Sequence, residues 1–243
     1  IRTDTRQVVT VYTQFGSAYS LRVDDVPQTT GYGDPVQASF SFRDGETLVG
    51  ATCGDPKLYP DPPEELLAAL EEGDPQPPFA VVVTQQGKCT RFPIQNHSEP
   101  STRSGRKFVS LAKGDQALTV YPSHGDENVC VATFRGRVTL FTVDQIPPKG
   151  STVKGVNAIR LDKGDRVLAY ALARKKRDGL VTRTNRGREL IVRETSYKPV
   201  KRGGKGYQVL RLGRIVEWDW PPMVLEPGRA GADDDGEDEG GEP

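Results

Sequence analysis

The stretch Thr133-Phe134-Arg135-Gly136 ends one β-prone run of the 243-residue chain, and a second β-prone run follows it at once. A glycine between two such runs predicts a tight hairpin, because glycine tolerates the positive φ that these turns need. Similar stretches occur three more times, which indicates an internal repeat. The other copies are Thr13-Gln14-Phe15-Gly16, Thr84-Gln85-Gln86-Gly87 and Thr184-Asn185-Arg186-Gly187.

A second glycine turn follows each hairpin at a similar distance. Gly45, Gly114 and Gly164 come 29, 27 and 28 residues after the hairpin glycines, and Gly213 is a degenerate fourth member. Alternating apolar residues precede these turns, as expected of strands. A unit of about 50 residues with four strands matches a blade of a propeller-like fold. We therefore expect an all-β fold of about four blades, with repeats near residues 7–54, 79–122, 128–172 and 179–220.

The first repeat is followed by an insertion, residues 55–78, which the other repeats lack. Its proline-flanked centre, residues 64–72, predicts a short amphipathic helix on the surface. Residues 1–225 are then expected to form one repeat domain. Residues 226–243 are expected to be a disordered acidic tail.

Composition and motifs argue against several classes of function. No apolar run approaches the roughly 20 residues of a membrane-spanning helix, and the first residues are not a signal peptide. The start at Ile1 rather than Met suggests a fragment. The three cysteines are far apart, and His97 and His124 lie in polar turns without the spacing of metal ligands. We therefore expect a reduced cytosolic protein with surface histidines and no metal site.

No arrangement of residues predicts catalysis. Asp115 and Asp165 recur at repeat turns, so they are interpreted as turn residues rather than as an acid/base pair. Neither a Walker-type loop nor a dinucleotide-binding glycine motif is present. We therefore expect no active site and no cofactor in this chain.

Charge is distributed unevenly along the chain. Residues 1–78 hold 5 basic and 13 acidic side chains, a net charge of −8. Residues 79–225 hold 27 basic and 12 acidic side chains, net +15, and residues 226–243 hold 1 and 8, net −7. This pattern indicates a polyanion-binding body with an acidic tail. Basic residues that merely keep a sheet soluble would give the same totals.

The connecting stretches at 99–107, 148–155 and 201–206 occupy one position of the repeat and carry cations beside glycine; the first, 28–33, carries none. In blades around an axis they would form a basic arc on one rim, to which the hairpin turns add further cations. Lys and Arg suit the DNA backbone, and glycine lets the chain approach a ligand closely. The candidate DNA-binding residues are Lys88, Arg91, Arg103, Arg106, Lys107, Arg135, Arg137, Lys149, Lys154, Arg186, Arg188, Lys201, Arg202 and Lys205.

Three stretches resemble a known family. They are residues 19–27, Arg135-Gly136-Arg137-Val138 and, most specifically, residues 154–165. Over residues 7–220 the chain is similar to the C-terminal repeat domain of the bacterial type IIA DNA topoisomerase A subunit, found in gyrase and topoisomerase IV. The loop Lys201, Arg202, Gly203, Gly204, Lys205, Gly206 resembles the gyrase box, Gln-Arg-Arg-Gly-Gly-Lys-Gly, although it occurs here in the last repeat rather than the first.

The resemblance implies a β-pinwheel, a propeller-like disc whose blades exchange strands. It implies a non-catalytic domain whose basic rim wraps duplex DNA for strand passage and control of DNA topology. The implied partners are DNA, the rest of the A subunit and the ATPase B subunit, in the cytoplasm and at the nucleoid. ATP and magnesium would act elsewhere in the enzyme. The chain has fewer repeats than gyrase usually has, so gyrase and topoisomerase IV both stay open as the parent.

A propeller-like protein-interaction module is the alternative, with the insertion and the tail as docking elements. The position of the cations separates the two functions. Cations gathered on one rim favour DNA, whereas scattered cations and a dominant apolar patch favour a protein partner.

Overall fold

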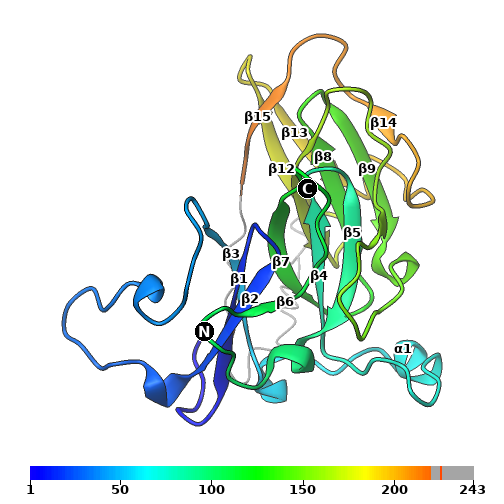
Figure 1. Ribbon diagram of the computed structural model, residues 1–243. Helices are drawn as coiled ribbons and strands as arrows, with labels where there is room; N and C mark the ends of the chain where they lie inside the picture. The colour runs from blue at the N-terminus through cyan, green and yellow to red at the C-terminus, as the bar shows by residue number, and fades with distance from the viewer. Residues whose placement is uncertain (220–224, 226–243) are drawn as a thin grey trace, which may run out of the picture.

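The computed structural model describes residues 1–219 and Leu225, and it shows an all-β chain of four antiparallel sheets that follow one another in sequence (Figure 1). The expected all-β pinwheel is confirmed. Three sheets have four strands and the fourth has three, within the described residues.

Each sheet is one blade. Blade 1 has the order β3 (Leu48–Cys53), β1 (Val8–Thr13), β2 (Ser17–Arg22), β6 (Arg106–Lys107). Blade 2 has the order β7 (Ala117–Ser123), β4 (Phe79–Thr84), β5 (Lys88–Pro93), β10 (Val156–Asn157). Blade 3 has the order β11 (Val167–Ala173), β8 (Asn128–Thr133), β9 (Arg137–Thr142), β14 (Tyr207–Gln208). Blade 4 has the order β15 (Ile215–Trp218), β12 (Gly179–Thr184), β13 (Glu189–Arg193).

The outermost strand of blades 1, 2 and 3 comes from the next repeat along the chain. β6 pairs with β2, β10 with β5 and β14 with β9, each through two residues. The chain therefore leaves one blade, lays a short strand on the blade before it, and returns to form its own inner strand. This exchange ties neighbouring blades together and defines the pinwheel.

The Thr-x-x-Gly stretches form the hairpin turns between the two central strands of each blade. The four glycines have φ between 75° and 79°. The threonine hydroxyl accepts the backbone N–H four residues later in three blades, at 3.3 Å for Thr84, 3.0 Å for Thr133 and 3.1 Å for Thr184. The residue after the threonine joins two blades: Gln85 donates its N–H to Gln116 O and accepts from Val167 N of the next blade.

The hydrophobic core lies between the blades. Alternate residues of a central strand face opposite neighbours, as the period of a strand requires. In β4, Ala80 and Val82 pack toward blade 1, whereas Val81 and Val83 pack toward blade 3. Both faces of the middle blades are thus buried, and their strands carry almost continuous apolar runs.

Short helices occupy the connections. The 3-10 turns are η1 (Val23–Asp25), η2 (Val36–Ala38), η3 (Pro56–Leu58), η4 (Ile94–His97) and η5 (Val143–Gln145). The one α-helix among the described residues is α1 (Glu64–Ala68) in the insertion, shorter than the segment from which the sequence predicted it. The insertion lies against blade 2, because Leu66 faces Gly125 and Pro75 faces Gly150.

Two other sequence-based expectations have different outcomes. His97 is not a surface residue: it is 5% exposed, and its ring packs edge-on against Tyr12 and Phe92 because η4 folds back over the first core cluster. Burial holds the pKa of His97 at about 4, with a smaller effect of Arg106 in the same direction. Asp115 and Asp165 are turn residues as predicted, since they accept the N–H groups of Gln86 and Arg135.

Candidate nucleic-acid interface

The connecting loops form a continuous band on the outer edge of the blades. We call residues 99–107, 148–155 and 198–206 the basic rim. In every case the segment before a second turn donates a backbone hydrogen bond to the rim loop of the next repeat. These bonds run from Ser41 N to Arg103 O (2.8 Å), from Ser110 N to Val153 O (3.0 Å) and from Arg160 N to Gly204 O (2.8 Å).

The loop of the first repeat, residues 28–33, is not part of this band. It has no cation and projects away from blade 1 with Tyr32 fully exposed (Figure 1). The band therefore begins at the outer edge of blade 1 and ends at blade 3.

Glycines at the end of each rim loop serve strand exchange. Gly105, Gly155 and Gly206 have φ of 67°, 74° and 64° and directly precede β6, β10 and β14. A Cβ on any of them would meet a backbone carbonyl of the blade below, that of Ala18, Cys89 or Val138. These glycines therefore have a structural reason of their own, since Gly206 lets the chain approach the outer strand of blade 3.

Most predicted rim cations are exposed, and the charged groups of two of them donate hydrogen bonds to backbone carbonyls. Arg106 donates to the carbonyl oxygens of Glu99 and Pro100 at 3.2 Å, and Lys107 Nζ donates to Phe15 O at 2.8 Å. Burial lowers the pKa of Lys107, and the nearby Arg43 lowers it further. The exposed members of the basic rim are Arg103, Arg106, Lys107, Lys149, Lys154, Lys198, Lys201 and Lys205.

Two predicted cations support the rim from beneath. Arg202 is half-buried and donates to Gln145 O at 2.9 Å and to Asn157 O at 2.6 Å, which fixes the last rim loop to blades 2 and 3. Lys88 donates to the side chain of Asn157 at 2.7 Å. Both residues thus meet at Asn157, where the second and third rim loops come together.

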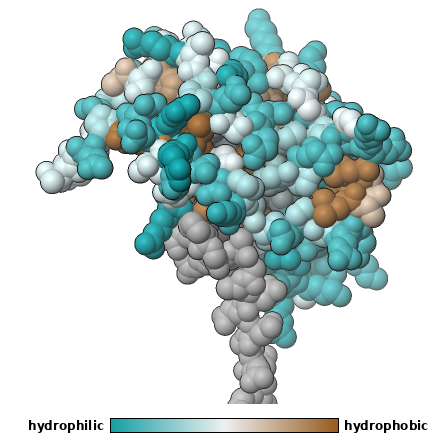
Figure 2. All heavy atoms as spheres, turned by 90° about the horizontal axis from the view of Figure 1, so that it is seen from below, coloured by the Kyte–Doolittle hydropathy of each residue, from teal (hydrophilic) through white to brown (hydrophobic). Residues whose placement is uncertain are grey.

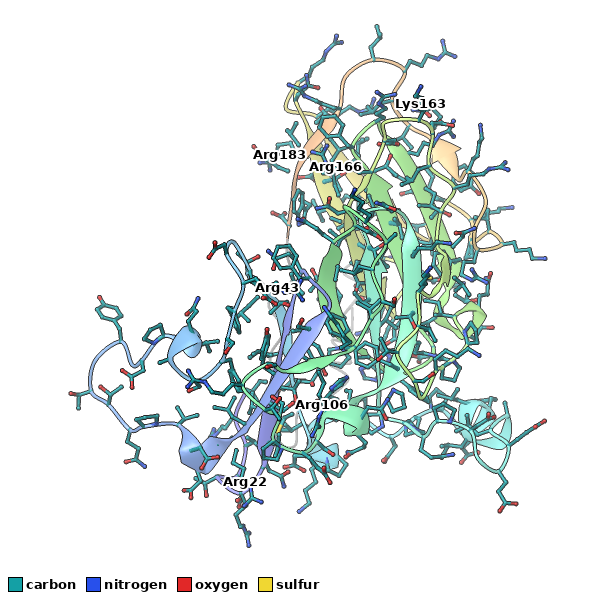
Figure 3. All side chains as sticks on the ribbon, viewed as in Figure 1. Arg22, Arg43, Arg106, Lys163, Arg166 and Arg183 are labelled. Atoms are coloured by element: carbon teal, nitrogen blue, oxygen red, sulfur yellow. The ribbon has the colours of Figure 1, made fainter. Side chains whose placement is uncertain are left out.

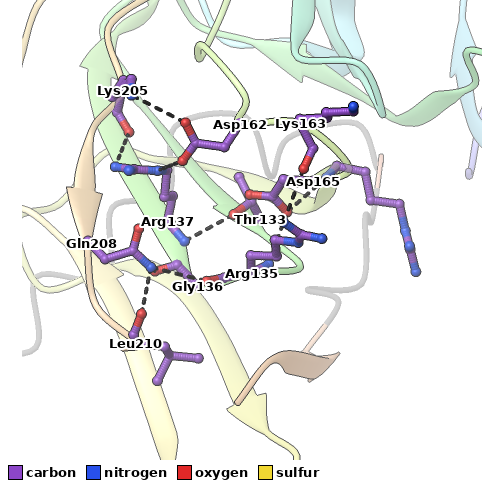
Figure 4. Close-up of polar contacts among 11 residues, drawn as sticks. Thr133, Arg135, Gly136, Arg137, Asp162, Lys163, Asp165, Lys205, Gln208 and Leu210 are labelled. Carbon is purple, nitrogen blue, oxygen red and sulfur yellow. Dashed lines mark hydrogen bonds and ion pairs between the residues drawn. The ribbon is translucent and has the colours of Figure 1, made fainter. Parts of the chain in front are cut away.

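Arg137 and Lys205 share one carboxylate (Figure 4). Arg137 Nε lies 2.8 Å from Asp162 Oδ2, and Lys205 Nζ lies 3.3 Å from Asp162 Oδ1. The hydrogen bond from Arg137 and then that from Lys205 hold the pKa of Asp162 below its usual value. Asp162 was not singled out in the sequence.

Arg91 is a wrong prediction. Arg91 is only 3% exposed, and its guanidinium lies over the Phe79 ring, 5.1 Å from the ring centroid. Burial lowers its pKa. The next rim loop covers it, because Lys149 N donates to Arg91 O. Arg91 therefore cannot contact DNA in this structure.

The hairpin turns carry the remaining predicted cations, Arg135, Arg186 and Arg188, which are exposed. Sequence reasoning missed further cations, namely Arg43 beside the hairpin turn of blade 1, and Lys163, Arg166 and Arg183 near the hairpin turns of blades 3 and 4 (Figure 3). Arg166 stacks on Phe134 at 4.4 Å. The signal was available, since Arg43 and Lys163 flank the second-turn glycines.

A run of four cations, Arg174–Arg177, was also missed. It forms the turn between β11 and β12, at the opposite end of the blades from the hairpin turns. Arg174 pairs with Asp126 at 3.2 Å and Lys176 with Glu194 at 3.7 Å. Four consecutive basic residues were visible in the sequence, but they lie outside the rim loops.

The described residues show no sign of two other kinds of site. Within residues 1–219 and Leu225, no group of three or more His, Cys, Asp or Glu side chains could hold a metal ion. None of the described helices is long and apolar enough to cross a membrane.

Known proteins resemble this chain in sequence and in fold. The family described as DNA gyrase C-terminal domain, beta-propeller matches residues 11–54, 127–169 and 180–214. The DNA gyrase A subunit of Staphylococcus epidermidis is 24% identical over 221 residues, 87% of this chain and 23% of that protein. The DNA gyrase A subunit of Kosmotoga olearia is 28% identical over 166 residues, 66% of this chain and 20% of that protein. The chain thus spans about a quarter of the length of these relatives.

Solved structures share the arrangement of blades. The C-terminal domain of DNA topoisomerase IV has a TM-score of 0.74 at 17% identity, covering 89% of this chain and 64% of that one. The Escherichia coli ParC C-terminal domain has a TM-score of 0.68 at 17% identity, with 90% and 83% covered. The DNA gyrase A C-terminal domain has a TM-score of 0.60 at 15% identity, with 89% and 66% covered. With repeats, exchanged strands and matched ranges in agreement, the chain belongs to the DNA gyrase C-terminal domain family.

Proposed function

We propose that this chain is the DNA-wrapping domain of a type IIA topoisomerase A subunit and that it bends duplex DNA around the basic rim. One observation carries the proposal: the segment that follows each of the first two rim loops donates a backbone hydrogen bond to the next rim loop, from Ser110 N to Val153 O and from Arg160 N to Gly204 O, so that three cation-bearing loops lie side by side. A duplex lying along this band would meet cations from three successive blades. Each cation that neutralises a phosphate releases counterions, which drives binding.

The binding is expected to depend little on base sequence. The longest helix among the described residues is the five-residue α1, so this part of the chain offers no recognition helix for the major groove. The rim presents Lys and Arg side chains on loops, and such side chains contact phosphates more readily than base edges. Any preference would then come from how easily a sequence bends.

The parent enzyme supplies the chemistry in this proposal. We infer that the domain acts beside the rest of the A subunit and the ATPase B subunit, with ATP and magnesium bound outside this chain. The domain would present DNA for strand passage without cutting it.

Salt titration of DNA binding tests the proposal. The rim exposes eight cations, so the slope of log K against log salt is expected to approach about −7 if all reach phosphates. Replacing Lys149, Lys154 and Lys201 with glutamine should make the slope shallower by about 2.7. Replacing Lys175, Lys176 and Arg177 with glutamine is the matched control, since it removes the same charge away from the rim.

Wrapping is tested separately with closed circular DNA that is relaxed while the domain is bound. A change in linking number is expected, and it should disappear in the rim variant but persist in the control. Binding without any linking-number change would mean that the domain binds DNA but does not wrap it. Equal effects of the two variants would mean that the basic rim is not the DNA-binding surface.

A specific feature favours a second role, protein docking at the insertion. Leu67 of α1 is 46% exposed, with the exposed acidic residues Glu64 and Glu65 beside it. The face seen from below is mostly hydrophilic, with a compact hydrophobic patch on the side where α1 lies in Figure 1 (Figure 2). We propose that a basic, partly apolar segment of the parent enzyme docks here. Leu67→Glu should weaken binding to the purified partner subunits but not to DNA, and unchanged binding to those subunits would refute the role.

A further inference from the structure

Blade 3 carries an anion inside its own cationic surface. The two oxygens of Asp162 each take one cation, Arg137 at 2.8 Å and Lys205 at 3.3 Å. A backbone phosphate presents two unesterified oxygens in the same way, and Arg and Lys bind both groups. The carboxylate is 41% exposed and Lys205 is 50% exposed, so this position opens to solvent on the rim.

The carboxylate is not needed to form the turn on which it sits. Its backbone carbonyl accepts Asp165 N at 3.0 Å, and the side chain of Asp165 accepts the N–H groups of Arg135 and Arg166. Within residues 1–219, the side chain of Asp162 bonds only to the two cations. Another anion can therefore replace the Asp162 carboxylate on Arg137 and Lys205 without loss of the turn.

Comparison of the repeats shows that this acid is specific to blade 3. The residue whose carbonyl accepts the N–H three positions later is Arg43 in the first repeat, Ala112 in the second and Asp162 in the third, each at 3.0 Å. The two cations have counterparts in blade 2. Lys88 starts the outer hairpin strand as Arg137 does, and Lys154 precedes the positive-φ glycine as Lys205 does. Blade 2 thus has the cations without the acid.

We propose that Arg137 and Lys205 form a binding site for a DNA backbone phosphate, and that Asp162 occupies this site as an internal substitute. Blade 3 then binds DNA in competition with its own carboxylate, whereas in blade 2 the described residues place no carboxylate on Lys88 or Lys154, and Lys88 donates only to the neutral side chain of Asn157. The inference rests on the proposed DNA-binding function. It predicts that DNA engages blade 2 before blade 3.

Asp162→Asn tests the proposal, because the amide keeps the shape and removes the charge. The affinity for duplex DNA should rise roughly two- to fivefold, the change expected of one exposed ion pair. The salt slope should steepen by about 0.9, which corresponds to one more phosphate. Asp126→Asn is the matched control, since Asp126 is also 41% exposed and pairs with Arg174 away from the rim. It should leave the salt slope unchanged.

The reciprocal change adds the acid to blade 2. Ala112→Asp should weaken binding by a similar factor, whereas the control Ala69→Asp, at an exposed residue directly after α1, should not. The double variant Asp162→Ala/Ala112→Asp keeps the net charge. Hydroxyl-radical footprinting of the protein, with and without DNA, should show that the side chains protected by DNA shift from blade 2 to blade 3.

The outcomes are distinct. Equal effects of Asp162→Asn and Asp126→Asn would mean that only total charge matters, and weaker binding by Asp162→Asn would mean that the acid orders the cations for DNA. Either result overturns the phosphate site but leaves the proposed function standing. A wild-type chain that binds no DNA at any salt concentration would overturn both.

Discussion

Gly206→Ala probes the contact that holds the last rim loop to blade 3. Gly206 has φ of 64°, and its backbone lies against the carbonyl of Val138. An alanine there adopts a left-handed conformation at a cost of about 1–2 kcal/mol. Its Cβ also meets the Val138 carbonyl and lies 3.0 Å from the Thr139 Cβ. Such overpacking adds about 1–3 kcal/mol.

The expected loss of unfolding free energy is therefore about 2–5 kcal/mol. For a domain of this size, each kcal/mol shifts the melting temperature by about 2–4 °C, so a decrease of roughly 4–20 °C is expected. The pairing of β14 with β9 should be lost first, which faster hydrogen exchange at Val138 and Tyr207 would report. DNA binding should also weaken, because Lys201 and Lys205 are held by this loop.

Gly204→Ala is the control in the same loop. Gly204 has no positive φ, is exposed, and the nearest atom to an added Cβ is Lys201 O at 3.6 Å. Its melting temperature should stay within about a degree of the wild type. If Gly206→Ala melts like Gly204→Ala, strand exchange does not stabilise the blade as argued.

Three further predictions concern burial, pH and the tail. Arg91→Met should keep the DNA affinity and salt slope and keep or raise the melting temperature, because it replaces a buried cation by an apolar chain; lost DNA binding in a folded variant would contradict the burial. Since burial holds the pKa of His97 at about 4, below 6.5, the unfolded state takes up a proton first as the pH falls. Stability is then lost between about pH 6.5 and pH 4, by up to about 3 kcal/mol, and urea unfolding of His97→Gln should show a flatter dependence in this range. Ending the chain at Leu225 should tighten DNA binding, because residues 226–243 carry net −7; unchanged affinity would indicate a solubilising tail.

The repeats were predictable because one local signal, Thr-x-x-Gly, has one structural cause. The glycine supplies the positive φ, and in three blades the threonine hydroxyl accepts the N–H of the residue four positions later, for example that of Arg137 at 3.0 Å. Both causes act within five residues, so the sequence alone reveals them. The strand exchange needs contacts between distant residues, such as Gly155 with Cys89, and only the family resemblance pointed to it.

Single cations were harder to place for a physical reason. Both faces of blade 2 are covered by neighbours, so alternation along β5 does not tell which residues reach water. Arg91 lies between the buried residues Thr90 and Phe92. Residues at one repeat position also differ in charge, as Arg43, Ala112 and Asp162 do. The repeated loops in the sequence therefore predict where the basic rim lies, but they do not predict which residue each cation contacts.

The outer edge of blade 4 differs from the other three in a way that affects the path of DNA. The residue two positions after the hairpin glycine is buried beneath the exchanged strand in blades 1, 2 and 3, where it is Ala18, Cys89 and Val138. In blade 4 this residue is Glu189, which is exposed and lies 3.9 Å from Arg183.

The surroundings of the hairpin glycine also distinguish blade 4 from the other blades. An added Cβ at Gly187 would meet no described atom within 4 Å, whereas Gly136 lies against Leu210 of the exchanged segment. A charged, uncovered strand of this kind resists pairing with another strand. A duplex that follows the rim would therefore leave the joined loops at blade 3 and meet a mixed edge at blade 4, where Glu189 opposes the attraction of Arg186 and Arg188. Asp162 in blade 3 and Glu189 in blade 4 both lower the attraction for phosphates at this end of the path. The tightest DNA contact is therefore expected at the junction of blades 1 and 2.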